Sequence, residues 1–217
     1  MVTVGADELI DVVSATGRYL RTTTRAEVHT EGLWHQSFHC MVIRPGSEGR
    51  VVLQRRHQSK AAFPGLLDLS ATGHLSAGET PADGIRELEE ELGIELDRDR
   101  LVPVGMRLLA DDEGEGINRE RVHLFFVADD RPLDAFAPDP GEVDGLVEAS
   151  ADDLMRLVGE LDGPEPAPIA GLGWRPGGAV EHIEVRRADL VKPIDGYWTL
   201  LLLMAGRFAR GEGPIVI

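Results

Sequence analysis

The chain has 217 residues, of which 42% are hydrophobic, enough to bury one sizeable core and most simply one domain. Its 38 acidic residues outnumber 22 basic ones and give a formal net charge of −16, which argues against a nucleic acid polymer or an anionic membrane as partner. The single cysteine, Cys40, excludes an internal disulfide, and no apolar run is long enough to span a bilayer, so we expect a cytoplasmic protein.

Two hairpins are predicted at the start of the chain. Within residues 1–24, two strands flank a turn at Thr16–Gly17, and a short helix follows from about Thr24. Apolar strands at 38–44 and 50–55 are joined by a turn rich in proline and glycine, so they form the second hairpin.

The middle of the chain alternates loops, one helix and several strands. The Gly-rich stretch 64–79 is expected to be a loop, and residues 81–92 a helix. Further strands are predicted at residues 101–109, 121–128 and 142–150.

The last third of the chain is predicted to begin with a helix over 151–161, capped by Ser150 or Asp152. Residues 163–179 contain too much Pro and Gly for a regular element and predict an exposed loop. One more strand at 179–187 precedes a C-terminal helix that stops at Gly211. This order of elements predicts an α+β fold, a mixed sheet packed between helices.

The helix over 81–92 carries an unusual concentration of glutamates. At about 100° per residue, Leu88 and Leu92 share one arc, which must face the core, while Glu87, Glu90 and Glu91 share another. Like charges at this spacing destabilise an isolated helix. Carboxylates that converge after a glycine-rich loop suit Mg²⁺ or Mn²⁺, which prefer hard oxygen ligands and bridge to phosphate oxygens.

Residues 73–94, GHLSAGETPADGIRELEEELGI, resemble the Nudix box. The pattern is Gly, five residues, Glu, seven residues, then Arg-Glu-aliphatic-any-Glu-Glu-any-Gly-aliphatic. Its fixed positions are filled by Gly73, Glu79, Arg86, Glu87, Leu88, Glu90, Glu91, Gly93 and Ile94. Only six residues separate Glu79 from Arg86, so we expect a shorter start of the helix, an intact metal face and a less certain Glu79–Arg86 contact.

The resemblance implies a Nudix fold, with a core over about 25–160, a hairpin extension over 1–24 and a loop and helix over 161–217. It also implies roles for the box residues. The metal ligands would be Glu87, Glu90, Glu91 and a backbone carbonyl near Thr72 or Gly73. Arg86 would orient these carboxylates, Glu79 and Gly93 would be structural, and Glu90 or Glu120 would be the general base.

Residues 25–94 are similar to the isopentenyl-diphosphate isomerase-like branch of this family. In that branch, basic residues of the segment that corresponds to RRHQSK bind the substrate diphosphate. The resemblance therefore implies this role for Arg56 and Lys60. The isomerases also need a cysteine just before the Gly-His pair, where this chain has Thr72, so isomerase activity is disfavoured. Cys40 is predicted to be a small buried residue instead.

Histidines near the box admit a second metal site. His35, His74 and Glu120 sit near positions that hold a second metal in the isomerases, although a lone histidine is more often structural, and His74 is also a candidate for substrate contact. No role is assigned to His29, His39, His57 or His123. Trp174, Tyr197 and Trp198 could stack on a base but are more often packing residues.

The sequence therefore predicts a Mg²⁺- or Mn²⁺-dependent pyrophosphohydrolase that cleaves a diphosphate linkage in a nucleoside diphosphate-X molecule. The alternatives are an isopentenyl-diphosphate isomerase and a non-catalytic Nudix module that senses a nucleotide. The expected partner is a small diphosphate, and assembly as a homodimer is left open.

Overall fold

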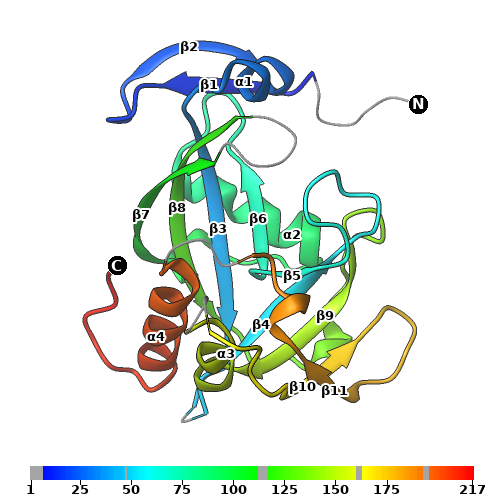
Figure 1. The fold of residues 1–217 in the computed structure, drawn as a ribbon. Helices are drawn as coiled ribbons and strands as arrows, with labels where there is room; N and C mark the ends of the chain where they lie inside the picture. Colours follow the sequence, from blue (N-terminus) through cyan, green and yellow to red (C-terminus); the bar gives the residue numbers. More distant parts are fainter. Residues whose placement is uncertain (1–6, 47, 112–116, 160–162, 193–195) are drawn as a thin grey trace.

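The structure is a computed structural model that describes residues 7–46, 48–111, 117–159, 163–192 and 196–217. A nine-stranded mixed sheet with helices on both faces confirms the predicted α+β class (Figure 1). Its main path runs β11-β10-β9-β4-β3-β8-β7, while β5 pairs with β4 and β6 with β3. These strands are β3 (His35–Ile43), β4 (Arg50–Arg56), β5 (Leu67–Asp68), β6 (Ala71–His74), β7 (Val102–Asp111), β8 (Asn118–Ala128), β9 (Val143–Ser150), β10 (Ile169–Trp174) and β11 (Glu181–Val185).

The long strand β3 organises the sheet. It pairs in parallel with β8 along its whole length, which is the one parallel pairing among the described strands. On its other side it pairs with β6 through residues 37–40 and with β4 only at Val42 and Ile43. The sheet therefore forks beside β6, and short loops there bring the Gly-rich segment against the centre of the sheet.

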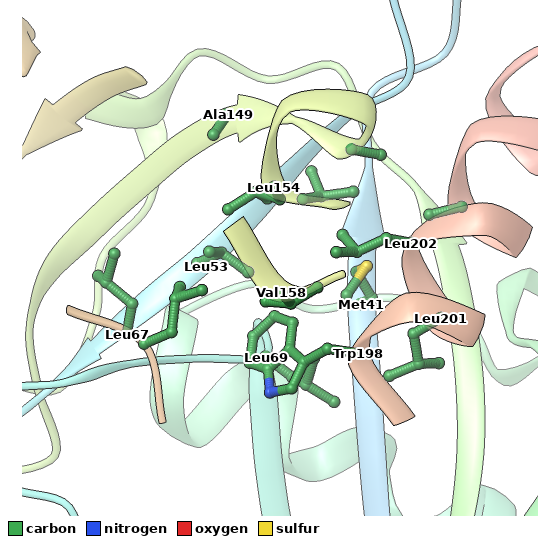
Figure 2. Close-up of a cluster of buried hydrophobic side chains, with 14 of the residues drawn as sticks. Met41, Leu53, Leu67, Leu69, Ala149, Leu154, Val158, Trp198, Leu201 and Leu202 are labelled. Atoms are coloured by element: carbon green, nitrogen blue, oxygen red, sulfur yellow. The ribbon is translucent and has the colours of Figure 1, made fainter. Parts of the chain in front are cut away.

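Two hydrophobic clusters cover the two faces of the sheet. Because side chains alternate along a strand, Met41 and Ile43 belong to one cluster and Phe38, Cys40 and Val42 to the other. The first cluster packs under α3 (Ala151–Val158) and α4 (Tyr197–Ala209), as Figure 2 shows. The second packs under α2 (Arg86–Leu92). Cys40 is fully buried, as predicted, and burial raises the pKa of its thiol.

The N-terminal hairpin forms as predicted, with β1 (Leu9–Val13), β2 (Tyr19–Thr24) and the helix α1 (Arg25–Glu31), which Thr24 caps. This hairpin lies across the loop that follows β6. The Gly78 N–H donates to Asp11 Oδ2 at 2.8 Å, and Ser76 Oγ donates to Glu8 at 2.9 Å. The extension thus fixes the glycine-rich loop.

The predicted helix over 81–92 is two elements rather than one. A 3₁₀ turn, η1 (Pro81–Ile85), precedes α2, and Thr80 forms a capping box with Asp83. A 3₁₀ turn has 3.0 residues per turn and a greater rise than an α-helix. The 3₁₀ turn therefore compensates for the missing residue between Glu79 and Arg86, and α2 still directs its glutamates toward β6.

Three sequence expectations about strands were wrong. Residues 64–79 are not only a loop, because β5 and β6 pair with the sheet there. The strand β8 begins at Asn118 rather than at the predicted residue 121, so Glu120 lies within it. Residues 163–179 contain β10, whose backbone pairs with β9 and β11 although its composition suits a loop. Its Gly173 packs closely on β11, since a Cβ there would lie 3.0 Å from the Ile183 side chain.

The remaining elements agree with expectation. Ser150 rather than Asp152 caps α3, its hydroxyl accepting from the Asp153 N–H at 3.4 Å. The C-terminal helix α4 ends just before Gly211, which has a φ of 72°. Short 3₁₀ turns η2 (Arg98–Arg100), η3 (Leu133–Ala135) and η4 (Arg187–Asp189) complete the described elements.

Candidate active site

The carboxylates of α2 do not share one environment. Glu87 and Glu91 are buried against the sheet, with 8% and 3% of their surfaces exposed, whereas the side chain of Glu90 is 57% exposed. Glu91 Oε2 accepts hydrogen bonds from Gln54 Nε2 and from the Thr72 N–H, both at 2.8 Å. Two of the three predicted ligands therefore point at β6, and the third lies at the rim.

Gly73 allows this close approach. A Cβ at Gly73 would lie 2.1 Å from the carboxyl carbon of Glu87, so no other residue fits without moving that carboxylate. The backbone of β6 and the carboxylates of Glu87 and Glu91 thus converge. Such a set of oxygens fits Mg²⁺ or Mn²⁺, which agrees with the sequence prediction.

Burial also makes the two inner carboxylates costly to ionise. It raises the pKa of Glu87 to about 7, against the opposing effect of the Arg86 guanidinium. It raises the pKa of Glu91 to about 8, although the hydrogen bond from the Thr72 N–H favours the ionised form. A bound divalent cation would supply the missing positive charge, because nearby opposite charge favours ionised carboxylates.

Arg86 connects the box residues. Its Nε donates to Glu79 Oε1 at 2.8 Å, and its Nη1 lies 2.7 Å from Glu87 and 2.9 Å from Glu90. Its Nη2 donates to the backbone carbonyl of His74 at 2.9 Å. The contact between Glu79 and Arg86 therefore survives the missing residue. Gly93, the other structural box position, ends α2 with a φ of 66°, and a Cβ there would lie 2.2 Å from the Ala137 carbonyl.

A second cluster lies on the opposite face of β6. Nitrogen atoms of His29, His35 and His74 all lie within 4.8 Å of one another. The Nε2 atoms of His35 and His74 are buried and have no hydrogen-bond partner among the residues that the structure describes. Burial lowers the pKa of His74 well below its ordinary value, so its imidazole is neutral near pH 7. Neutral imidazoles that share an unsatisfied pocket are typical metal ligands.

Sequence reasoning missed His29, which α1 contributes. Its position beside His35 and His74 depends on the N-terminal hairpin folding over the sheet, and spacing in the chain gives no signal of that. Only five residues, with Gly32 among them, separate His29 from His35, and this short spacing does not by itself place either histidine beside His74.

Glu120 belongs to the histidine cluster and not to the glutamate cluster. Its carboxylate accepts from Ser37 Oγ and from Asn118 Nδ2, both at 2.6 Å, and lies 4.0 Å from His74 Nε2. Burial alone would raise the pKa of Glu120, but the hydrogen bonds from Ser37 and Asn118 favour the ionised carboxylate. Glu120 is therefore a buried, ionised carboxylate.

Basic side chains approach the carboxylates from the loop after β4. Lys60 forms an ion pair with Glu142, and it is near enough to Glu91 for that charge to act on its pKa, although burial has the larger effect and lowers it. Arg56 pairs with Asp68 at 3.1 Å. Arg25, which the sequence analysis did not single out, lies near enough for its charge to act on both Lys60 and His74.

The aromatic candidates divide. Trp174 and Trp198 are buried, with 7% and 3% exposed, and Trp198 extends from α4 into the first hydrophobic cluster (Figure 2). Both tryptophans are therefore packing residues, the more common of the two roles considered from the sequence. Tyr197 Oη lies 2.9 Å from His39 Nδ1, and the Arg107 guanidinium lies 4.0 Å from the centre of its ring.

One family matches most of the chain, including the residues of the box. The model of the NUDIX domain family matches residues 33–168. The chain belongs to the Nudix family. An uncharacterised Nudix hydrolase of Clostridium acetobutylicum is 34% identical over 159 residues, which cover 72% of this chain and 77% of that protein.

Isomerase-named Nudix relatives also match. The isopentenyl-diphosphate Delta-isomerase of Cutibacterium acnes is 31% identical over 160 residues, 71% of this chain and 79% of that protein. The crystal structure of a Deinococcus radiodurans protein shares the fold, with a TM-score of 0.53 and 21% identity over 69% of this chain and 87% of that one.

Membership settles the class of reaction. As a Nudix hydrolase, the protein acts on diphosphate bonds, and it stands in the branch that includes the isomerase-named relatives. Thr72 stands just before the Gly73-His74 pair, where the resemblance to the isomerases implies a cysteine. None of the helices in the described ranges is long and apolar enough to cross a membrane.

Proposed function

We propose that the protein is a Mg²⁺- or Mn²⁺-dependent pyrophosphohydrolase that cleaves the diphosphate linkage of a nucleoside diphosphate-X molecule in the cytoplasm. The observation that carries this proposal is the convergence of the Glu87 and Glu91 carboxylates on the backbone of β6 at Gly73. Both carboxylates are buried and both have a raised pKa, so the site is built for a cation.

Different glutamates of α2 are proposed to bind the metal and to act as the general base. Glu87 and Glu91 would hold the divalent ion, which when bound would activate a water molecule and neutralise charge on the leaving phosphate. Arg86 holds Glu87 and Glu90 in place. Glu90 is our choice of general base, because it is exposed at the rim of the same helix face, whereas both oxygens of Glu120 already accept hydrogen bonds on the other side of β6.

The diphosphate would be bound by the cations that face the carboxylates. Lys60, Arg56 and Arg25 supply positive charge in a chain whose net charge is −16. Without these side chains, the acidic surface would repel an anionic substrate. The His74 imidazole faces the histidine cluster, so we assign it to that cluster rather than to the diphosphate.

The imidazole cluster supports a second ion. We propose that His29, His35 and His74, with Glu120 beside them, hold a divalent ion that favours nitrogen ligands, such as Zn²⁺ or Mn²⁺. Metal analysis of the purified chain would show this ion even when the helix glutamates are removed.

The test is a substrate screen with a matched pair of variants. Purified protein is assayed with nucleoside diphosphate sugars, dinucleotides, coenzyme A and nucleoside triphosphates in Mg²⁺ and in Mn²⁺. Glu91→Gln should lower turnover at least about a hundredfold, because the amide still accepts from Gln54 and Thr72 but carries no charge for the cation. Glu89→Gln is the control, since Glu89 is exposed and points away. Turnover of the Glu91 variant within a few-fold of the parent would contradict the metal assignment.

Isomerase activity is the second candidate, favoured by the isomerase-named relatives. An assay with isopentenyl diphosphate for the dimethylallyl product tests it. We expect no product from the parent, because the Thr72 hydroxyl is far less acidic than a thiol. Absence of metal-stimulated phosphate release across the whole screen would instead support a non-catalytic sensing module. Gel filtration would show whether the single-domain chain of residues 1–217 assembles as a homodimer.

A further inference from the structure

Phe63, in the loop between β4 and β5, has an unusual backbone. Among the residues that the structure describes, it is the non-glycine residue with a positive φ, 52°. Its side chain is also exposed, at 41%. A bulky side chain in the left-handed region is rare because its Cβ crowds the backbone, and such outliers cluster at ligand sites.

The local turn does not account for Phe63. The Leu66 N–H donates to the Phe63 carbonyl at 3.3 Å, with Pro64 and Gly65 between them and a φ of 74° at Gly65. These are the residues that a type II turn prefers at its two central positions. The first position of that turn needs neither a positive φ nor an aromatic ring. The Phe63 ring also belongs to none of the hydrophobic clusters or ring pairs formed by the described residues.

The loop holds this ring on a fixed frame. Arg56 binds the loop from both sides, its Nε donating to the Ala62 carbonyl and its own carbonyl accepting from the Gly65 N–H, both at 3.0 Å. The His57 N–H donates to the Glu142 carbonyl at 2.9 Å, and Glu142 pairs with Lys60. An exposed aromatic ring on such a loop is already positioned for a ligand, which reduces the entropic cost of binding.

The ring lies beside the proposed diphosphate site. Phe63 is three residues after Lys60, so their Cα atoms are at most about 11 Å apart. The Lys60 ammonium in turn lies within the electrostatic reach of Glu91 and Glu87. A molecule whose diphosphate contacts Lys60 can therefore extend its other end over Phe63.

We propose that Phe63 is the stacking platform for the nucleobase of the substrate. This inference rests on the proposed function and narrows it, because it requires a planar aromatic group at the end of the molecule away from the cleaved linkage. A base has an aromatic face and a polar edge, so it suits a ring that is open to water. An isoprenyl chain would need an enclosed apolar wall instead.

Two non-hydrolysable ligands distinguish the contribution of Phe63 to binding from that of the diphosphate site. α,β-Methylene-ADP carries a base, and methylenediphosphonate carries only the phosphorus groups; binding of each is measured by calorimetry with Mg²⁺. Phe63→Leu removes the aromatic face, Phe63→Trp keeps one, and Tyr19→Leu removes an exposed aromatic ring from the distant β1–β2 hairpin as a control. Any base can serve as probe, because every base offers a stacking face.

We expect Phe63→Leu to weaken binding of α,β-methylene-ADP by about tenfold, within the range of single-base stacking, and to leave methylenediphosphonate unchanged. Phe63→Trp should restore the affinity, and Tyr19→Leu should change neither. Equal effects on both ligands, or no effect of Phe63→Leu, would overturn the platform while leaving the diphosphate site intact. If the parent binds neither ligand, the proposed function itself fails.

A stability measurement excludes a structural role for the ring. Phe63→Gly relieves the positive φ, so thermal unfolding should occur at the same temperature or higher even though base affinity is lost. A clear loss of stability in Phe63→Gly would show that the ring supports the fold and would count against the proposal.

Discussion

Gly73 links backbone geometry to metal affinity. A methyl group at this position would lie 2.1 Å from the Glu87 carboxyl, which can only turn away from β6. We expect Gly73→Ala to weaken Mg²⁺ binding by about 10–100-fold, the usual effect of disturbing a ligand's support, with little loss of stability because a side-chain end can move. Calorimetric titration with Mg²⁺ measures this. Gly196→Ala, at a position with no heavy atom within 4 Å, is the control and should bind normally.

The histidine cluster predicts a metal content that does not depend on the glutamates of α2. His35→Gln should remove the nitrogen-bound ion, measured as Zn²⁺ or Mn²⁺ per purified chain by elemental analysis, while Glu91→Gln should retain it. His182→Gln replaces an exposed histidine on β11 and should leave the metal content unchanged. Equal metal content in His35→Gln and the parent would refute the second site.

Among single residues, periodicity predicted most of the site. The helical arc that groups Glu87, Glu90 and Glu91 follows from 100° per residue, and it predicted the helix face that we propose binds the metal. Periodicity could not tell that Glu90 lies at the rim, because exposure depends on how far α2 sits from the sheet. Nor could it find Arg25 or His29, whose neighbours come from distant parts of the chain.

At the scale of elements, the 3₁₀ turn η1 packs tightly on β3. A Cβ at Gly84 would lie 2.5 Å from Phe38, whose position in the sheet is fixed on both sides. We expect Gly84→Ala to cost about 1–3 kcal/mol in the free energy of unfolding, the usual penalty of overpacking, measured by urea denaturation. The folded fraction should still bind Mg²⁺, in contrast to Gly73→Ala. An unchanged unfolding midpoint would mean that η1 can move away from the sheet.

Elements with strong local signals were predictable, and those formed by pairing were not. The helix start near Thr24 and the caps at Thr80 and Ser150, the last offered with Asp152 as alternative, were predictable because a cap is chemistry between near neighbours. The strand β10 was missed because its glycines and flanking prolines suit a loop, and only hydrogen bonding to β9 and β11 makes it a strand. Non-local pairing overrides composition in such segments.

For the whole molecule, the buried carboxylates predict how stability depends on pH. The pKa values of Glu87 and Glu91 are raised to about 7 and about 8 in the folded protein, so the unfolded chain binds fewer protons than the folded one between about pH 5 and pH 8. Without metal, stability should therefore fall as pH rises through this window. Thermal unfolding followed by circular dichroism should show the midpoint falling, by about 2–4 °C for each kcal/mol lost.

Magnesium should reverse this trend, because it binds the ionised carboxylates and only in the folded state. The increase in the unfolding midpoint on adding Mg²⁺ should be larger above about pH 8 than below about pH 6, where protons compete for the ligands. Glu91→Gln should flatten both dependences, and Glu89→Gln should change neither. A magnesium effect that does not vary with pH would contradict protonation of the inner carboxylates.

Side chains alternate between the two faces of β6, so a substitution of the side chain at position 72 does not affect the main-chain contacts of the same residue. The Thr72 and His74 side chains face the imidazoles, Gly73 faces Glu87, and Glu91 is held by the Thr72 main chain rather than by its side chain. The side chain at position 72 can therefore be exchanged without altering any hydrogen bond of the glutamates. Related chains could acquire or lose a proton-exchanging thiol here through single substitutions, so a hydrolase and an isomerase lie a short evolutionary distance apart on one scaffold.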